Sequence, residues 1–359
     1  MNTDKKNQHY IPKFYLRNFS IDNNQKQIGI YNIKSRFFYA SAALKQQGSK
    51  NFFYGHDGVI EDQLSNIEGR LATLIKNITS SLILPKRNSK EHMELLLFAV
   101  LTHIRNPVSI EGIKKSQSMM KERLLEESPE SELDGLIPDI SHEDAISLSL
   151  SNISRILETI NDLHFKLLIN KTEAPFISSD FPVVKYNSFL EKKKWSLSKT
   201  GYVTKGLQIF IPLNPELLLV FYDSGIYKIG NKKDTVCEIR NLKDINQFNV
   251  LQVLNCSENI FFNKKVTKLY IENLLGTCIG YNRPNESTAE MSYLHKEGDD
   301  DSIPKKNKNL IILGSTDCEI NLQTDIVKMH SGAKKYVITN HAAQMRPLAD
   351  KLLRSRYDR

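Results

Sequence analysis

Residues 91–107 read EHMELLLFAVLTHIRNP, and this stretch sets the class of the fold. Most of its first twelve positions are apolar, so the sequence predicts a buried helix. The proline at 107 ends this helix, because proline disfavours helical backbone at the residue before it. Arg105 therefore leaves a buried helix end, and an unpaired buried charge is costly. We expect it to pair with Asp180 or with an acidic residue of the preceding helix, and a purely structural ion pair is the simple alternative.

Helical patterns flank this stretch on both sides. Apolar residues between 60 and 78 recur at three- and four-residue steps, which predicts an amphipathic helix of about five turns. Further helices are predicted over 110–127 and from 141 to 163. Nearer the N-terminus, apolar and aromatic residues alternate in 27–31 and 35–40, a pattern typical of a hairpin.

After residue 163 the pattern changes to short runs rich in β-branched and aromatic residues. Strands are predicted at 165–170, 176–178, 183–186, 207–212, 217–222 and 260–262, with a second hairpin formed by 309–313 and 319–322. Helices are predicted over 242–256 and 342–356. Because helices gather first and strands later, we predict an α+β fold. Its helical N-terminal half would pack against a mixed, mainly antiparallel β-sheet C-terminal half.

These patterns divide the chain into five regions. They are an N-terminal arm and hairpin (1–57), a helical region (58–163), a sheet-rich region (164–282), a polar insert expected to be flexible (283–309) and a basic C-terminal segment (310–359). The chain has 359 residues, which suits two domains or one large elaborated domain.

The composition excludes several classes of protein. Hydrophobic residues make up 40% and charged residues 25%, which is enough apolar material for a core and argues against wholesale disorder. No apolar run approaches the roughly 20 residues that span a bilayer, and residues 1–8 are too polar for a signal peptide. The four cysteines lie far apart without a CxxC pair. We therefore expect a cytoplasmic protein with no membrane partner.

The net charge is +8 and is unevenly placed. Residues 305–359 contain eleven Lys and Arg against five Asp and Glu, a net of +6, which leaves +2 for the other 304 residues. A localised basic surface attracts polyanions, so the C-terminal segment is a candidate for binding nucleic acid. The alternative is a solvated helix face without a ligand.

Glycine-rich phosphate loops, HExxH and GxSxG are all absent, so the candidate residues come from smaller clusters. His9 sits on an arm stiffened by Pro12 and suits a base or a metal ligand, with Arg17 as a phosphate clamp. Asp180 sits at a bend before a proline and suits a cation ligand or an orienting group for His9. The alternatives are an arm that packs its aromatic residues into the core and an aspartate that caps its own turn.

Glu61 and Glu68 are seven residues apart on one predicted helix and therefore share a face. With His9 and Asp180, these carboxylates suggest a site for a divalent cation, Mg²⁺ or Mn²⁺, and the predicted metal ligands are His9, Asp180 and Glu61. A solvated acidic stripe is the ordinary alternative.

Taken in order, several stretches resemble a microbial family known as domain of unknown function 4238. They are HYIPKFYLRNF at 9–19, IRNP at 104–107, FISSDFPV at 176–183 and PLNPELLL at 212–219, followed by an asparagine-bearing helix around Asn249. The resemblance spans roughly residues 5–265. It implies no activity, but it implies that His9, Arg17, Arg105, Asp180 and Asn249 come together in one polar site.

We therefore expect an intracellular, nuclease-like enzyme of the kind found among bacterial toxins and antiviral defence effectors. His9, Asp180, Arg17, Arg105 and Asn249 would form its site, and the basic C-terminal segment would hold nucleic acid. The alternative is a non-catalytic module that binds nucleic acid or a protein partner, including a second copy of itself. In that case the same polar cluster binds an anion or locks the arm onto the sheet.

Overall fold

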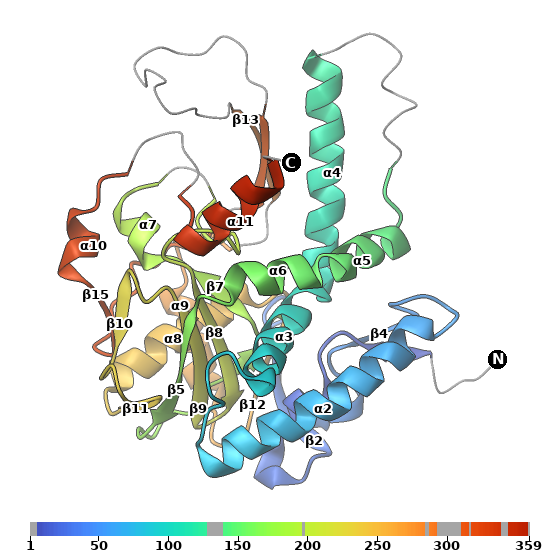
Figure 1. Cartoon of the computed structure of the whole chain (residues 1–359). Helices are drawn as coiled ribbons and strands as arrows, with labels where there is room; N and C mark the ends of the chain where they lie inside the picture. The colour runs from blue at the N-terminus through green and yellow to red at the C-terminus, as the bar shows by residue number, and fades with distance from the viewer. Residues whose placement is uncertain are drawn as a thin grey trace.

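Two sheets lie at the centre of the molecule, with helices packed around them (Figure 1). The computed structural model describes residues 6–127, 139–195, 198–283, 287–292, 310–315, 317–338 and 344–357. None of the helices in these ranges is both long and apolar enough to cross a lipid bilayer.

The larger sheet has five strands in the order β11-β5-β9-β8-β7. The β11–β5 pair is parallel and the other pairs are antiparallel. Its strands are β5 (His164–Asn170), β7 (Val184–Tyr186), β8 (Gln208–Asn214), β9 (Leu217–Tyr222) and β11 (Val236–Ile239).

The second sheet has four antiparallel strands in the order β3-β2-β12-β6. They are β2 (Gln27–Asn32), β3 (Phe38–Ala43), β6 (Ser178–Ser179) and β12 (Asn259–Phe262). Three antiparallel pairs stand apart, namely β1 (Asn7–His9) with β4 (Ser49–Asn51), β10 (Tyr227–Ile229) with β15 (Val327–Met329), and β13 (Ser287–Ser292) with β14 (Leu310–Ser315).

The helices come before, between and after these strands. They are α1 (Lys13–Arg17), α2 (Val59–Ser81), α3 (Lys90–Ile104), α4 (Pro107–Glu127), α5 (His142–Ser151), α6 (Ile153–Ile160), α7 (Ser188–Lys192), α8 (Leu242–Asn255), α9 (Lys268–Thr277), α10 (Ser331–Lys335) and α11 (Pro347–Tyr357).

The five-stranded sheet is buried on both faces, which explains why its central strands are continuous apolar runs. In β9, Leu219 and Phe221 belong to a core shared with α2, α3 and the N-terminal arm. Leu218 and Val220 point the other way, into a second core shared with α8 and α9. The central sheet therefore holds the N-terminal helices and α8 in fixed positions on opposite sides.

The predicted α+β class is confirmed, and the predicted helices over 60–78 and 91–104 match α2 and α3. The helices are not confined to the first half, because α7 to α11 follow residue 187 and β1 to β4 precede residue 52. Long-range pairing explains the mixture, since β2 pairs with β12 across more than 220 residues.

Two local predictions were wrong. The helix predicted from 141 to 163 is two helices that meet at Asn152. The hairpin predicted from 309–313 and 319–322 does not form, because β14 pairs with β13 instead. Much of the predicted insert 283–309 lies outside the described residues, but its segment Ser287–Ser292 is this strand β13.

Burial on both faces makes the centre of β9 sensitive to truncation. Leu219→Ala should lower the free energy of unfolding by about 2–5 kcal/mol, because it leaves a cavity in a closed core. Leu269→Ala, at a site on α9 that is 66% exposed, should change it by less than about 0.5 kcal/mol. Urea denaturation measures both values, and equal costs would contradict a sheet covered on both sides.

Candidate functional site

Arg105 is the most deeply buried charge among the predicted site residues. It caps the C-terminus of α3, its side chain is 0% exposed, and its Nη1 donates to Oε1 of Glu68 at 2.7 Å. Burial lowers the pKa of Arg105, but Tyr54, Glu68 and Glu61 outweigh that effect, so its pKa is raised and it stays charged. The acidic partner is therefore on α2, which is one of the two partners predicted.

Glu61 faces the same guanidinium from one end of α2. Burial raises the pKa of Glu61, and the nearby Glu68 raises it further, while Arg105 and a hydrogen bond from the His9 backbone act in the opposite direction. The seven-residue spacing thus places both carboxylates on the face of α2 that looks toward Arg105. We call His9, Tyr54, Glu61, Glu68 and Arg105 the arginine cluster.

His9 joins this cluster through the pairing of β1 with β4. It is 5% exposed, and its Nε2 donates to the Lys45 carbonyl at 3.3 Å. Burial, assisted by the charges of Lys13 and Arg105, lowers the pKa of His9 from 6.5 to about 4. The imidazole is therefore neutral at pH 7.

Asp180 lies in a second network, where its carboxylate closes the turn between α8 and β12. Its Oδ1 accepts the N–H of Ser257 at 2.8 Å, and its Oδ2 accepts those of Glu258 and Asn259 at 2.7 and 2.9 Å. Burial raises the pKa of Asp180, and these three backbone bonds oppose that shift. Both oxygens of the Asp180 carboxylate therefore hold backbone groups. This resembles the alternative of an aspartate that caps its own turn, except that Asp180 caps a turn distant in the chain.

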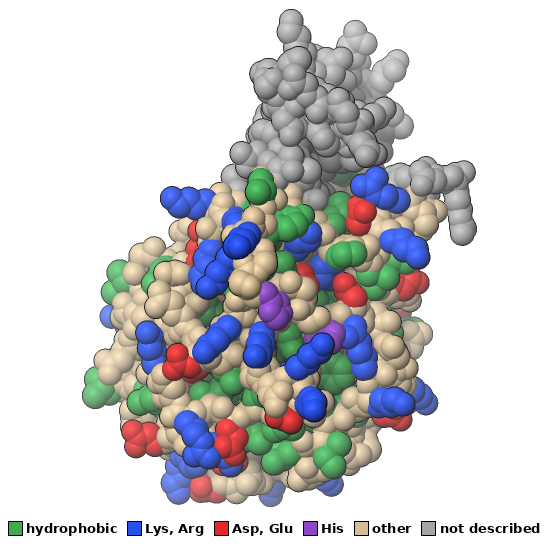
Figure 2. Space-filling model, turned by 60° about the vertical axis from the view of Figure 1, so that its left-hand side comes forward, with side chains coloured by type: hydrophobic (Ala, Val, Ile, Leu, Met, Phe, Trp, Pro, Cys, Tyr) green, Lys and Arg blue, Asp and Glu red, His purple; other side chains and the backbone are tan. Residues whose placement is uncertain are grey.

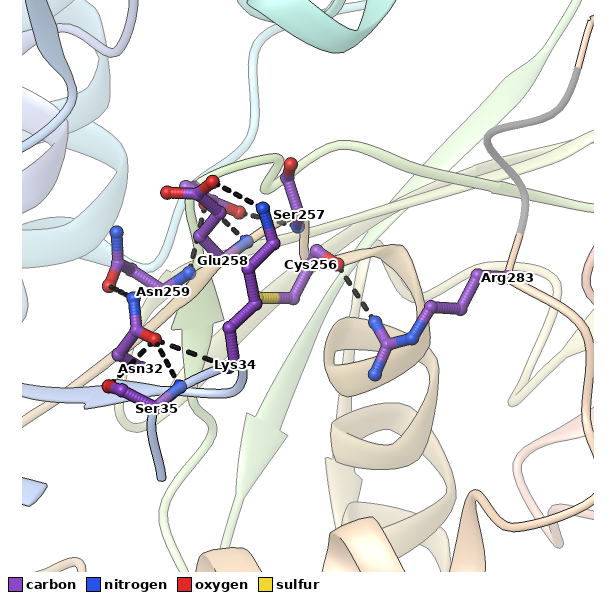
Figure 3. A network of polar contacts seen from close by, with 9 residues as sticks. Asn32, Lys34, Ser35, Cys256, Ser257, Glu258, Asn259 and Arg283 are labelled. Carbon is purple, nitrogen blue, oxygen red and sulfur yellow. Dashed lines mark hydrogen bonds and ion pairs between the residues drawn. The ribbon is translucent and has the colours of Figure 1, made fainter. Parts of the chain in front are cut away.

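Other side chains reinforce the same turn from both sides (Figure 3). Asn32 donates to Asn259 at 3.0 Å, and Lys34 pairs with Glu258 at 2.6 Å. Arg283 donates to the carbonyl groups of Val253 and Cys256 at the end of α8, where a cation also suits the helix dipole.

Asn249 is fully buried, and both polar atoms of its side chain form hydrogen bonds. Its Nδ2 donates to the Pro175 carbonyl at 2.9 Å and to the Tyr270 hydroxyl at 2.8 Å, and its Oδ1 accepts the Ile177 N–H at 3.1 Å. Gln252 and Asn255 on the same helix donate to the carbonyl groups of Pro182 and Phe181. The sequence analysis missed these two, although polar residues three apart in an apolar helix were the available signal.

Asn106 connects the two networks. It follows Arg105 in the chain, and its Nδ2 donates to the Asp180 carbonyl at 2.7 Å. Tyr10, which follows His9, also lies near Asp180: burial raises the pKa of Tyr10, and the Asp180 charge raises it further. His9, Arg105 and Asp180 are thus neighbours in adjoining networks, and all three are buried.

Two expectations from the sequence do not match this arrangement. Arg17 is exposed at the end of α1, and Asn249 faces the segment before β6, so neither belongs to the arginine cluster. No group of three or more His, Cys, Asp and Glu side chains in the described ranges is arranged to hold a metal ion. The structure does not bring His9, Asp180 and Glu61 together as such a group, and metal binding by these residues stays a prediction from the sequence.

A surface that the sequence analysis did not identify carries an excess of lysine. Lys228 on β10 and Lys328 on β15 are direct cross-strand partners, and both are exposed. We define the lysine face by these two residues with Lys192 and Lys194 near α7 and Lys334 and Lys335 on α10. Figure 2, which brings this side of the molecule forward, shows Lys and Arg gathered on it with few Asp or Glu among them.

Contacts between its elements hold the lysine face together. Lys193 Nζ donates to the Lys334 carbonyl at 2.8 Å and so joins α7 to α10. Lys205 Nζ donates to the Tyr336 hydroxyl at 2.8 Å and lies 4.1 Å from the centre of that ring. A small hollow between α7, β10 and β15 is lined by Ser188, Lys192, Tyr227, Leu322, Thr324, Val327 and Met329.

The basic C-terminal segment contributes to this face only in part. Lys328, Lys334 and Lys335 belong to it, but Arg346 is 1% exposed and has a structural role. Its Nε donates to the Asp162 carboxylate at 3.0 Å, and its other nitrogens donate to backbone carbonyl groups, including that of Thr204. The rest of the face comes from α7 and β10, which lie far earlier in the chain.

Loss of the carboxylate beside Arg105 should be costly. Glu68→Gln should destabilise the fold by about 2 kcal/mol, because the buried guanidinium loses its ion-pair partner and keeps only the nearby charge of Glu61. Glu94→Gln is the matched control, since its partner Arg70 is 55% exposed and such pairs contribute about 0–1 kcal/mol. Chemical denaturation measures both, and similar costs would mean that water already stabilises Arg105.

The low pKa of His9 should make the fold sensitive to acid. An unfolded histidine binds a proton near pH 6.5 and folded His9 only near pH 4, so stability falls as the pH drops between these values. Between pH 7 and pH 5, wild type should therefore lose about 1–2 kcal/mol more of its free energy of unfolding than His9→Gln loses. Unfolding measured at both pH values tests this, and an unchanged difference would contradict a neutral, buried His9.

Comparison with known proteins gives one family. A family model described as "Protein of unknown function (DUF4238)" matches residues 7–266, which is well over half of the chain. No curated protein and no solved structure matches.

Proposed function

We propose that this chain, which belongs to the DUF4238 family of proteins of unknown function, binds nucleic acid through the lysine face. The observation that carries the proposal is the cross-strand pair of Lys228 and Lys328. Like charges directly opposite each other in a sheet are destabilising, and a bound polyanion removes that repulsion.

The electrostatics of the lysine face support this role. Within the described part of the chain, its six lysines form no ion pair with an acidic side chain. Acidic side chains in this region are engaged elsewhere: Glu191 bonds to Tyr186 and Asn321, and Asp223 accepts the N–H groups of Gly206 and Gly225. The lysine charges are therefore free to meet phosphates, whose contacts dominate affinity for nucleic acids.

The arginine cluster supports the binding role over the catalytic one. Arg105 already has Glu68 as its counter-charge, and Glu61 adds a second acidic group, so an incoming phosphate would meet repulsion there. Asp180 uses both carboxylate oxygens to hold a turn. We therefore assign these residues to the stability of the fold, and phosphodiester cleavage stays a prediction from the sequence alone.

Substitution of face lysines should weaken binding and its dependence on salt. For Lys228→Gln/Lys328→Gln and Lys334→Gln/Lys335→Gln, the slope of log K against log salt should fall by about 0.7–0.9 for each lost phosphate contact. Lys76→Gln/Lys90→Gln removes the same charge from α2 and α3, outside the face, and should keep the wild-type slope. Fluorescence anisotropy of a labelled oligonucleotide over a salt series measures the slopes.

Two results would overturn the proposal. Equal effects of the face and control variants would show that only total charge matters. Cleavage of RNA or DNA that requires Mg²⁺ or Mn²⁺, and that disappears in both His9→Ala and Asp180→Ala, would assign the function to the polar networks instead. Thermal melting of each variant separates a lost activity from a lost fold.

A further inference from the structure

Two aromatic side chains stand exposed beside each other on the β2–β3 hairpin. Phe37 is 60% exposed and Tyr39 is 51% exposed. Their ring centres lie 5.9 Å apart and the ring planes differ by 24°. We call these two residues the aromatic platform.

The hairpin holds the platform in place through the residue between them. Phe38 points inward, where its ring stacks on that of Phe262 at 5.0 Å and 19°. It pairs with Tyr31 in the sheet, while Tyr39 pairs with Ile30. The alternation of a strand therefore directs Phe37 and Tyr39 together toward solvent.

The surroundings of the platform favour a flat, anionic ligand over an apolar one. Arg36 directly precedes Phe37, is exposed, and forms no ion pair with a residue that the structure describes. Lys34 in the same turn is already paired with Glu258, so Arg36 is the cation that carries this argument. The residues that follow, Ala40 and Ser41, are small and exposed, so they leave space beside the rings.

The edge of the sheet is not shaped to receive a strand from another protein. β3 is an edge strand, and its pairing with β2 is irregular between Ile28 and Ile30. Such irregularities twist an edge and interrupt its row of hydrogen-bonding groups. The rings, and not the backbone, are therefore the binding feature of this hairpin.

We infer that the aromatic platform stacks bases of single-stranded nucleic acid. The two ring centres are 5.9 Å apart, a spacing at which each ring can contact a neighbouring base of an extended strand. Every base has a flat π-face, so this contact selects unpaired bases without reading their sequence. The inference rests on the proposed function, and it narrows the ligand from any nucleic acid to a single strand.

The test compares an oligothymidylate of about 16 nucleotides with an abasic strand of the same length and charge. Phe37→Ala/Tyr39→Ala should weaken binding of the oligothymidylate by roughly 5- to 150-fold per lost stack, with the salt slope unchanged. The same variant should bind the abasic strand as wild type does. Phe37→Tyr/Tyr39→Phe keeps both rings and should keep the affinity.

Matched controls separate stacking from other effects. Ile279→Ala removes a side chain that is 83% exposed elsewhere on the surface and should leave the affinity unchanged. Because both platform rings point outward, the alanine variant should melt within a few degrees of wild type. An equal loss of affinity for both strands, or no loss for either, would overturn the inference.

The two proposals fail in different ways. If the lysine variants lower the salt slope but the platform variant binds like wild type, base stacking on the aromatic platform is wrong and binding through the lysine face is supported. If the platform variant alone loses affinity for the oligothymidylate, base stacking on the aromatic platform is supported and binding through the lysine face is wrong. If wild type binds neither strand, both are wrong.

Discussion

The enclosed charge of Arg105 is the constraint on which the N-terminal half of the structure depends. A guanidinium with no exposed surface requires a counter-charge, because an unpaired buried ion costs several kcal/mol. That requirement sets the rotation of α2, which must turn Glu68 toward the end of α3. The same rotation directs Leu64, Leu71 and Ile78 into the core, so the ion pair and the apolar stripe specify one orientation.

The corner between α3 and α4 extends this constraint to the sheets. Asn106 donates to the Asp180 carbonyl, and the Asp180 carboxylate holds the turn that leads into β12. β12 in turn pairs with β2, so the N-terminal hairpin is tied to a segment that follows it by more than 220 residues. All these contacts lie within the residues that match the family, whereas Lys328, Lys334 and Lys335 lie beyond them. The lysine face thus combines the family's fold with later segments of this chain.

The sequence predicts those features of the fold that depend on neighbours in the chain. Helices α2 and α3 follow from apolar spacing, and the end of α3 follows from Pro107, because both signals are local. The candidate site was predictable only in part. The seven-residue spacing shows that Glu61 and Glu68 share a face of α2, but it does not show that Arg105 faces them. The partners of Asp180 are backbone groups of a turn 77 to 79 residues later, which no side-chain pattern reveals. The pairing of Lys228 with Lys328 likewise depends on a register between distant strands.

The cations of this structure fall into two classes, which differ in how their charges are balanced. Buried cations have their partners within the fold: Arg105 has Glu68, Arg346 has Asp162, and Lys166 donates to the carbonyl of Asp234 at 2.5 Å. Each of these cations fixes one element of the fold against another. Lys228 and Lys328 differ, because their cross-strand positions bring two exposed positive charges together. The fold pairs these interior cations but leaves Lys228 and Lys328 exposed, and the proposed binding of a negatively charged partner rests on that contrast.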